Sequence, residues 1–277
     1  MKILITGVGG FLGRWVARHL QSQHEVTGVY HSKRPPLDLP LVASNQKPDG
    51  HFDVLVLCHA SVSAGAVQQD DAALVAGNIT FTQQVLDWFP QAKVIYISTV
   101  SVYPAQKQTV VELSDTLPQS RYAQTKLEAE SLVLQRPQYA VVRLSSLYGS
   151  GMKDGTLIPN YVNQALCNGK IEVWGDGSRL QNYIHALDVA KLIGLIITND
   201  AFHRALYLGT DAQSYTNAQV ARLIAQKTNA TVEFVNNDNA SWAEYDGSFT
   251  RKAVNWQPEM PLTKGLDEYI EWKKKQY

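Results

Sequence analysis

Three glycines near the N-terminus constrain the fold more than any other feature of this chain. Gly7, Gly10 and Gly13 recur at every third residue, between an apolar run over Lys2–Thr6 and a helical pattern over Phe11–Gln21. A strand, a glycine turn and a helix in this order begin a βαβ unit. Gly7 permits a sharp turn, Gly10 lets the backbone approach a ligand, and Gly13 lets the helix pack close to the strand. The free N–H groups at the helix start would then bind the pyrophosphate of a dinucleotide.

Further apolar runs continue the alternation of strands and helices. Strands are predicted over Glu25–Tyr30, Asp53–Cys58, Lys93–Ser98 and Tyr139–Leu144, with a brief edge strand over Leu37–Leu39. Helices are predicted over Asp71–Phe89, Arg121–Gln135, Thr216–Lys227 and Leu262–Lys274, and a strand followed by a helix over Tyr183–Ile197. The pattern predicts an α/β fold, a Rossmann-type doubly wound parallel sheet with a smaller C-terminal substrate-binding region. We expect residues 1–149 with 182–198 to form the first part, and 150–181 with 199–277 the second.

The charge balance and the cysteines exclude several classes of protein. The 277 residues include 25 Lys plus Arg and 25 Asp plus Glu, so the net charge is zero and no global field attracts nucleic acid or a membrane surface. Cys58 and Cys167 lie far apart in apolar runs and are expected to be buried, reduced thiols, and the histidine spacing matches no metal site. Neither a signal peptide nor a membrane-spanning run is recognised, so we expect a cytoplasmic protein.

The end of the second predicted strand indicates which dinucleotide the site prefers. An acidic side chain there would bond the adenosine ribose and favour NAD. The chain has Tyr30 instead, and the residues that follow are His31, Ser32, Lys33 and Arg34. Cationic groups suit a 2′-phosphate, so we expect NADP, with NAD as the alternative; a solvated basic loop would read the same way. Asp38 is a candidate acceptor for the adenine amino group, or a plain surface residue.

Two further motifs carry candidate catalytic groups. Tyr122 and Lys126 are four residues apart and would share one helix face, where the ammonium would lower the pKa of the phenol and let it transfer a proton. This spacing is common, and a solvated helix pair would look the same. Thr99 stands at the end of a predicted strand, where a hydroxyl can polarise a reacting oxygen. Ser98 and Ser101 are its alternatives.

Taken together and in order, these elements resemble the extended short-chain dehydrogenase/reductase family of NAD(P)-dependent sugar epimerases, dehydratases and reductases. The matching segments are T-G-x-x-G-x-x-G at 6–13, Asn78 in N-I-T, S-T-x-x-V-Y at 98–103, Y-x-x-x-K at 122–126, Val142-Arg143, Leu147-Tyr148-Gly149, Gly175-Asp176-Gly177, the run at 183–190, Trp256-Gln257-Pro258 and a closing G-L-x-x-x-I-x-W helix. The resemblance implies Thr99, Tyr122 and Lys126 as catalytic residues, with Lys126 also holding the nicotinamide ribose. It implies cofactor contacts at Phe11, Leu12, Ala60 and Asn78, and a homodimer formed through helices such as 71–89 and 121–135. Asn78 would also help to order the active site; the alternative is a plain polar residue of its helix.

Two departures from the family pattern narrow the chemistry. Family dehydratases carry Asp and Glu after the catalytic threonine, whereas this chain has Val100 and Ser101, so 4,6-dehydration is disfavoured. Nucleotide-sugar members carry an Arg that grips the substrate diphosphate where this chain has Gln181, which cannot make a charge-assisted contact. Arg179 could compensate. Expected substrate contacts are therefore Thr99, Ser101, Arg179 and Gln181.

These observations predict an NAD(P)-dependent reductase or epimerase that acts on a sugar-like carbonyl or alcohol. The expected substrate is a nucleotide sugar, and Gln181 is the residue that weakens this assignment. A 4-keto reductase or an epimerase is favoured. The expected partner is a small molecule, with no nucleic acid and no membrane. The alternative is a non-catalytic NADP-binding sensor or scaffold, which would need the glycine loop but not the three catalytic residues.

Overall fold

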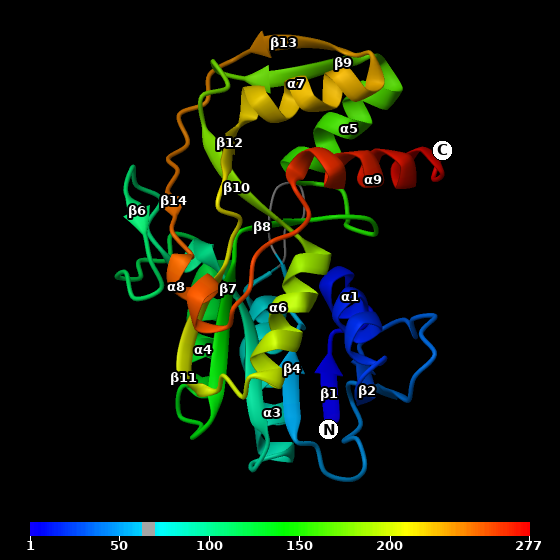
Figure 1. Ribbon diagram of the computed structural model, residues 1–277, viewed down its shortest axis with the longest axis vertical. Coiled ribbons are helices and arrows are strands. Elements are labelled where there is room, and N and C mark those ends of the chain that lie inside the picture. The colour runs from blue at the N-terminus through cyan, green and yellow to red at the C-terminus, as the bar shows by residue number, and fades with distance from the viewer. Residues whose placement is uncertain (63–69) are drawn as a thin grey trace.

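A seven-stranded parallel sheet forms the lower half of the molecule in the view of Figure 1, with strand order β11-β7-β5-β4-β1-β2-β3. Its strands are β1 (Lys2–Thr6), β2 (Glu25–Tyr30), β3 (Leu41–Ala43), β4 (Val54–Leu57), β5 (Lys93–Thr99), β7 (Tyr139–Leu144) and β11 (His203–Gly209). The computed structural model describes residues 1–62 and 70–277. The order reverses at β1, where the glycine turn follows the strand, and this is where open α/β sheets bind their ligands.

Alternate side chains of the central strands enter two separate cores, one on each face of the sheet. Ile3 and Ile5 of β1 pack under the helices α1 (Phe11–Leu20) and α6 (Ala186–Thr198). Leu4, between them, packs against α3 (Phe81–Trp88) and α4 (Arg121–Val133). Because both faces are covered, strands such as β4 and β7 are buried at every residue, which explains their continuous apolar runs. The predicted doubly wound fold is confirmed.

The helix predicted over residues 71–89 is present but interrupted. It consists of α2 (Asp71–Val75), a π-helical turn over Ala76–Thr80, and α3. Single π-helical turns widen a helix locally and occur often at functional sites. Asn78 lies in the middle of this turn.

The edge strand predicted over Leu37–Leu39 is wrong, because the strand beside β2 is β3, four residues further on. Pro35, Pro36 and Pro40 lack backbone N–H groups, so the segment that contains them cannot form a regular ladder. The carbonyl oxygen of Pro40 accepts a hydrogen bond from the Gly28 N–H, and regular pairing begins immediately after it.

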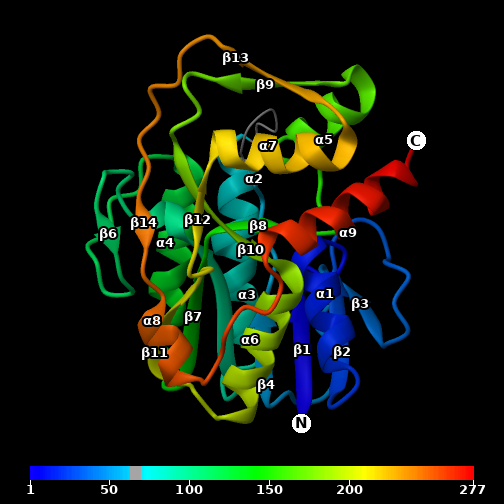
Figure 2. The same cartoon turned by 45° about the horizontal axis from the view of Figure 1, so that its top comes forward.

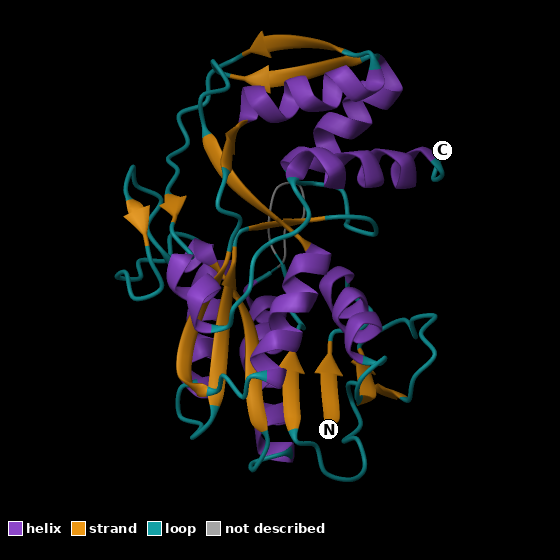
Figure 3. Cartoon of the chain, viewed as in Figure 1, coloured by secondary structure: helices purple, strands orange, loops and turns teal. Residues whose placement is uncertain are grey.

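A smaller region lies beyond the carboxyl ends of the parallel strands, at the top of Figures 1 and 3. Its strands are β8 (Ser146–Tyr148), β10 (Leu180–His185) and β12 (Ser214–Thr216) in one sheet, β9 (Lys170–Trp174) with β13 (Thr231–Val235), and β6 (Thr109–Val110) with β14 (Glu244–Tyr245). Its helices are α5 (Leu157–Asn168), α7 (Asn217–Thr228) and α9 (Leu262–Lys274), which share a second apolar core. Figure 2 shows α7 and α9 above the sheet, with α1 and α6 in front of it.

The chain crosses between the two regions more than once, and the exact division into residues 1–149 with 182–198 and the rest stays a prediction. For one segment the structure differs from that division. β11, which was expected in the smaller region, is the edge strand of the large sheet and pairs in parallel with β7. The helix α8 (Ser248–Ala253) packs against β11. No described helix is long and apolar enough to cross a membrane.

The two cysteines are free thiols in different environments. Cys58 follows β4 and is half-buried, whereas Cys167 is exposed near the end of α5, with its Sγ atom 3.4 Å from the Tyr277 hydroxyl. The expectation that both thiols are buried is therefore wrong for Cys167, since its apolar neighbours occupy the inward face of the helix and it does not. Within 1–62 and 70–277, no group of three or more His, Cys, Asp or Glu residues is arranged to hold a metal ion.

Candidate active site

The glycine turn has the geometry that its spacing predicts. Gly7 has a φ of +71°, which favours glycine, and its carbonyl oxygen accepts a 2.8 Å hydrogen bond from the Gly10 N–H. A Cβ atom on Gly13 would lie 2.3 Å from the Gly7 carbonyl oxygen, so only glycine allows α1 to start this close to β1. No side chain caps α1, and the N–H groups of its first turn are therefore available to an anion.

A cavity of about 720 Å³, here called the larger cavity, extends from this turn along the carboxyl ends of the neighbouring strands. It is lined by Gly7, Val29, Tyr30, His31, Ser44, Asn45, His59, Ala60, Ser61, Ala73, Ala76, Gly77, Thr80, Phe81 and Gln84. It brings together three of the predicted cofactor residues, Gly7, His31 and Ala60. Among the described residues, the lining contains no carboxylate, which agrees with the sequence at the end of β2.

Other predicted cofactor residues lie elsewhere. Ser32, Arg34 and Asp38 are exposed and do not line the larger cavity, while Phe11 and Leu12 begin α1 and pack into the cores. In their place the structure brings in Ser44, whose hydroxyl lies 3.0 Å from Nδ1 of His31, and Asn45 beside it. Sequence reasoning missed both because it placed the third strand too early; the carboxyl end of the true strand was the signal that could have found them.

Asn78, in the π-helical turn, joins the wall of the larger cavity to α4. The fully buried amide accepts a 2.8 Å hydrogen bond from the Ser61 N–H and donates to the Ser61 carbonyl oxygen and to Thr125 Oγ1, both at 3.0 Å. Thr125 immediately precedes Lys126. Asn78 therefore positions the helix that carries the candidate catalytic pair.

His59 forms a second link beneath the cavity. Its Nδ1 lies 2.6 Å from Thr6 Oγ1 and its Nε2 lies 2.9 Å from Thr82 Oγ1. Burial, followed by the charge of Lys126, lowers the pKa of His59 to about 3, so the ring is neutral and serves as a hydrogen-bonding bridge. The end of β1 and the helix after the π-helical turn are thereby held together.

Lys126 is buried in the middle of α4, and its side chain is 2% exposed. Its ammonium nitrogen lies 4.1 Å from the centre of the Tyr96 ring on β5. Burial lowers the pKa of Lys126 to about 7, although the charge of Glu130 opposes this shift. The half-buried Tyr122 lies one helical turn before it.

The phenol of Tyr122 does not have the lowered pKa that its spacing from Lys126 predicts. Burial raises the pKa of Tyr122 to about 12. The prediction assumed a charged lysine in contact with the phenol, whereas the ammonium lies over Tyr96 and is itself easily deprotonated. In this state Tyr122 is a protonated hydroxyl, suited to donate a proton.

Thr99 ends β5 and caps the 3₁₀ turn over Val100–Val102. Its Oγ1 accepts a 3.1 Å hydrogen bond from the Ser101 N–H and donates to Ser101 Oγ at 3.1 Å. Ser98 points the other way, with its hydroxyl buried in the protein. The geometry therefore favours Thr99, with Ser101 as its partner, over Ser98.

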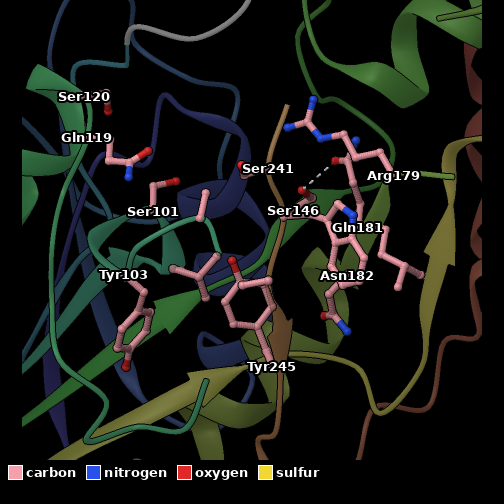
Figure 4. Close-up of a pocket in the computed structure, with 15 residues that line it drawn as sticks. Ser101, Tyr103, Gln119, Ser120, Ser146, Arg179, Gln181, Asn182, Ser241 and Tyr245 are labelled. Carbon is pink, nitrogen blue, oxygen red and sulfur yellow. Dashed lines mark hydrogen bonds between the residues drawn. The ribbon is translucent and has the colours of Figure 1, made fainter. Parts of the chain in front are cut away.

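A second cavity of about 310 Å³, here called the smaller cavity, opens beside this turn. Figure 4 shows Ser101, Gln119 and Ser120 on one side of it and Arg179, Gln181 and Asn182 on the other. Its remaining lining residues are Val100, Tyr103, Ala105, Ser146, Leu180, Ser241, Trp242, Ala243 and Tyr245. The predicted substrate residues Ser101, Arg179 and Gln181 thus line one cavity. Thr99 immediately precedes Val100, another residue of this lining. The wall formed by residues 241–245 was missed, because no motif marks that segment.

A buried ion pair contacts Tyr103, which belongs to the wall of the smaller cavity. Arg143 on β7 donates to both carboxylate oxygens of Glu130 on α4, at 3.1 and 2.6 Å. It also donates to the Tyr103 hydroxyl at 2.8 Å, and that hydroxyl donates to the Glu112 carbonyl oxygen. The network ties the 3₁₀ turn, α4 and β7 into one unit around the strand end that holds Thr99.

Comparisons with known proteins identify the family of the chain. The model of the NAD dependent epimerase/dehydratase family matches residues 3–208. Among curated proteins, a UDP-glucuronate 4-epimerase of Thermodesulfobacterium geofontis is 26% identical over 98% of this chain and 95% of its own length. A dTDP-4-dehydro-6-deoxy-D-allose reductase of Streptomyces is 23% identical over the same shares.

Solved structures share the fold over the whole chain. A UDP-glucose-4-epimerase of Stenotrophomonas maltophila, with bound NAD and formylated UDP-arabinopyranose, superposes with a TM-score of 0.89 at 19% identity, covering 100% of this chain and 98% of its own. A UDP-glucuronic acid 4-epimerase of Bacillus cereus, in complex with NAD, superposes with a TM-score of 0.86 at 21% identity, covering 100% of both chains.

Proposed function

Since the chain belongs to the NAD dependent epimerase/dehydratase family, we propose that it transfers hydride between a nicotinamide dinucleotide and the carbonyl or alcohol carbon of a sugar-like substrate. One observation carries this proposal. The strand end with Thr99 and the helix with Tyr122 and Lys126 pack together at the carboxyl edge of the sheet, between the glycine turn and the smaller cavity. A non-catalytic sensor would need only the glycine turn.

The glycine turn and the larger cavity have three features that fit a dinucleotide. The turn leaves no room for a Cβ atom on Gly13, the first turn of α1 has no side-chain cap, and the cavity reaches the end of β2. A bound nicotinamide dinucleotide supplies a hydride acceptor or donor. Gly7, Gly10 and the start of α1 would hold its pyrophosphate, His31, Ser44 and Ala60 its adenosine half, and Lys126 its nicotinamide ribose.

The proton that accompanies hydride transfer is assigned to Tyr122. Its phenol is protonated in this state, so it can donate a proton to the substrate oxygen in the reducing direction, which leaves a phenolate. In the oxidising direction the phenol must first lose its proton, and the phenolate then receives the proton of the substrate alcohol. Thr99 donates a hydrogen bond to the same oxygen in place of the one it makes to Ser101, which polarises the carbonyl. Lys126 contributes a positive charge to the site whenever its amine is protonated.

We assign no residue to the acid or base that elimination of water from the substrate would require. The position after Thr99 is Val100, an apolar side chain that offers no proton, and Ser101 is a weak acid. We therefore propose a reductase or an epimerase, and not a dehydratase. In a reductase the cofactor exchanges after each turnover, whereas in an epimerase the hydride returns to the same substrate and the cofactor stays bound.

NADP is the proposed cofactor, on the basis of charge. No carboxylate lines the described wall of the larger cavity, and the exposed cations Lys33 and Arg34 follow His31. A 2′-phosphate is favoured by such surroundings, whereas NAD usually meets an acidic residue there. The test is kcat/KM with NADPH against NADH; a preference for NADH would contradict this part of the proposal. A preference for NADPH would also favour the reductase over the epimerase.

The proposal predicts measurable turnover. Purified protein is incubated with reduced or oxidised NADP or NAD and a panel of sugar-like carbonyl and alcohol compounds, including free sugars, lactones and the nucleotide sugars named for the relatives. Consumption of reduced cofactor identifies a reductase; product formation with tightly held cofactor, which survives dialysis, identifies an epimerase. Cofactor binding without hydride transfer to any compound would favour the sensor instead.

A homodimer is proposed through α2, α3 and α4. These helices lie side by side on one face of the sheet, and their outer surface carries Arg121 paired with Asp71 and Glu128. Sedimentation equilibrium gives the mass in solution. A monomer at every concentration would contradict this proposal and leave the catalytic one untouched.

A further inference from the structure

Arg179 carries the charge of the smaller cavity. Among the described residues that line this cavity, it alone has a charged side chain at neutral pH, and none has a carboxylate. It immediately precedes β10, and because side chains alternate along a strand, it shares a face with Gln181. Figure 4 shows its guanidinium extending from this side of the cavity toward the side of Gln119 and Ser120. The positive charge therefore faces the space that a ligand would occupy.

The hydrogen-bonding capacity of this guanidinium is unused. Its Nη1 atom lies 4.0 Å from Oδ2 of Asp238, which is too long for a hydrogen bond. The other carboxylate oxygen of Asp238 accepts a 2.9 Å hydrogen bond from the Ala240 N–H, so this carboxylate is held within its own loop. The Nε atom of Arg179 is buried and has no hydrogen-bond partner among residues 1–62 and 70–277. A buried donor without an acceptor is costly, and a bound ligand would supply the missing acceptor.

The shape of the guanidinium indicates which ligand group fits. Nε and Nη2 form one edge of the planar group, separate from Nη1, and this edge can donate two parallel hydrogen bonds to the oxygens of one anion. The Arg179 side chain is 38% exposed, so the guanidinium is within reach of a molecule in the cavity. Carboxylates and phosphates have the paired oxygens that such a fork binds.

Lys107 adds positive potential to the same cavity. Its ammonium nitrogen lies 5.7 Å from the centre of the Trp242 ring, which belongs to the cavity wall. Lys107 does not itself line the cavity, so it contributes through its electric field and not by contact. The two cations favour a negatively charged ligand.

The other polar groups of the cavity are neutral. Gln181 donates to Asn217 Oδ1 at 3.0 Å, and its carbonyl oxygen accepts a hydrogen bond from the Ser146 hydroxyl at 3.5 Å, the dashed line in Figure 4. Gln181 is therefore already held by the protein, which leaves Arg179 as the anchor for an anion. The remaining hydroxyls suit the hydroxyls of a sugar, which both donate and accept hydrogen bonds; they belong to Ser101, Ser241 and Tyr245.

We infer that Arg179 binds an oxyanion of the substrate, a carboxylate or a phosphate, through its Nε–Nη2 edge, so that the substrate is an anionic, polyhydroxylated carbonyl compound or alcohol. This inference rests on the proposed function and names the charge of its substrate. The reacting oxygen is assigned to Thr99 and Tyr122, and Arg179 lies across the cavity from Ser101 (Figure 4). The anionic group therefore belongs to a part of the substrate away from the reacting carbon.

Binding measurements test the inference without relying on turnover. Protein saturated with the dinucleotide that it binds, so that the glycine turn is occupied, is titrated by calorimetry with glucuronate, glucose 1-phosphate, UDP and, as the neutral probe, glucose. At least one anionic probe is expected to bind wild-type protein about tenfold or more tightly than glucose. Arg179→Gln should remove this advantage. Arg179→Lys, which keeps the charge but not the planar fork, should retain part of it.

The matched control is Arg222→Gln, which removes an exposed cation of α7 and should bind every probe as wild type does. Circular dichroism shows whether each variant is folded. Binding of glucuronate that depends on Arg179 identifies a carboxylate as the recognised group, glucose 1-phosphate a phosphate ester, and UDP a diphosphate, and each of these results supports the inference.

Equal binding of the anionic probes by wild type and Arg179→Gln would overturn the inference, as would anionic probes that bind no more tightly than glucose. The failure of the proposed function is a separate result. If no compound of the substrate panel takes part in hydride transfer, the proposed function fails, and the titration still decides whether Arg179 binds an anion.

Discussion

Lys126 places its ammonium nitrogen 4.1 Å from the centre of the Tyr96 ring, so that the helix carrying the candidate acid is fixed against the strand that ends at Thr99. The contact is buried, and burial lowers the pKa of Lys126 to about 7. The same residue is therefore a structural contact, a candidate ribose ligand and a group that titrates near neutral pH.

This titration predicts how stability changes with pH. Because the pKa of Lys126 is lower in the folded protein, the unfolded chain binds this proton more readily between pH 7 and the ordinary lysine value near 10.4. The contribution of Lys126 to stability therefore increases as pH rises from 7 to 8.5, by about 1–2 kcal/mol. Urea unfolding of wild type and Lys126→Met, without cofactor, should show the advantage of the variant shrinking over this range. Lys275→Met, an exposed control, should keep a constant difference; the same constancy for Lys126→Met would contradict the prediction.

The glycine turn is predicted to tolerate one alanine and reject another. A Cβ atom on Gly13 would lie 2.3 Å from the Gly7 carbonyl oxygen, whereas on Gly9 it would meet nothing closer than 3.5 Å. Gly13→Ala should thus lose cofactor binding and about 2 kcal/mol or more of stability, and Gly9→Ala less than about 1 kcal/mol. Cofactor titration by fluorescence and thermal unfolding measure both effects. Similar behaviour of the two variants would show that α1 does not need the close approach.

Asn78 is expected to be important for stability as well as for the site. Asn78→Ala removes three hydrogen bonds from a fully buried position and leaves Ser61 and Thr125 without their partner. The expected loss is about 2–4 kcal/mol. Urea unfolding checks this, with Asn163→Ala, a more exposed hydrogen-bonded asparagine, as the control at less than about 1 kcal/mol. A loss no larger than that of the control would mean that water replaces the amide.

The ion pair between Glu130 and Arg143 predicts strong coupling. Removing one partner leaves a buried charge, so Glu130→Leu and Arg143→Met should each cost about 3–5 kcal/mol. The double variant should cost less than the sum of the two, by more than about 1 kcal/mol. A double-mutant cycle in urea measures this coupling. Additive losses would indicate that the two side chains act independently.

The fold and the order of the site were predictable because they depend on local patterns. The glycine turn specifies a strand–helix junction by its own backbone geometry, and the spacing of Tyr122 and Lys126 places them one turn apart on the same helix. The continuous apolar runs of β4 and β7 follow from burial on both faces.

The remaining features depend on contacts between distant segments. Trp242 and Tyr245 reach the smaller cavity only because β14 pairs with β6, and their segment carries no motif. Asp238 lies 4.0 Å from the Arg179 guanidinium although 59 residues separate them, which no spacing reveals. The raised pKa of Tyr122 was missed because it arises from burial, and a helix spacing says nothing of depth.

The central claim is that Tyr122 transfers the proton that accompanies hydride transfer. The most direct measurement is the kcat of Tyr122→Phe on an identified substrate, alongside Tyr277→Phe, an exposed tyrosine far from the site. We predict that Tyr122→Phe lowers kcat by about 10²–10⁴-fold, with cofactor affinity unchanged, and that Tyr277→Phe behaves as wild type. Undiminished turnover by Tyr122→Phe would contradict the account.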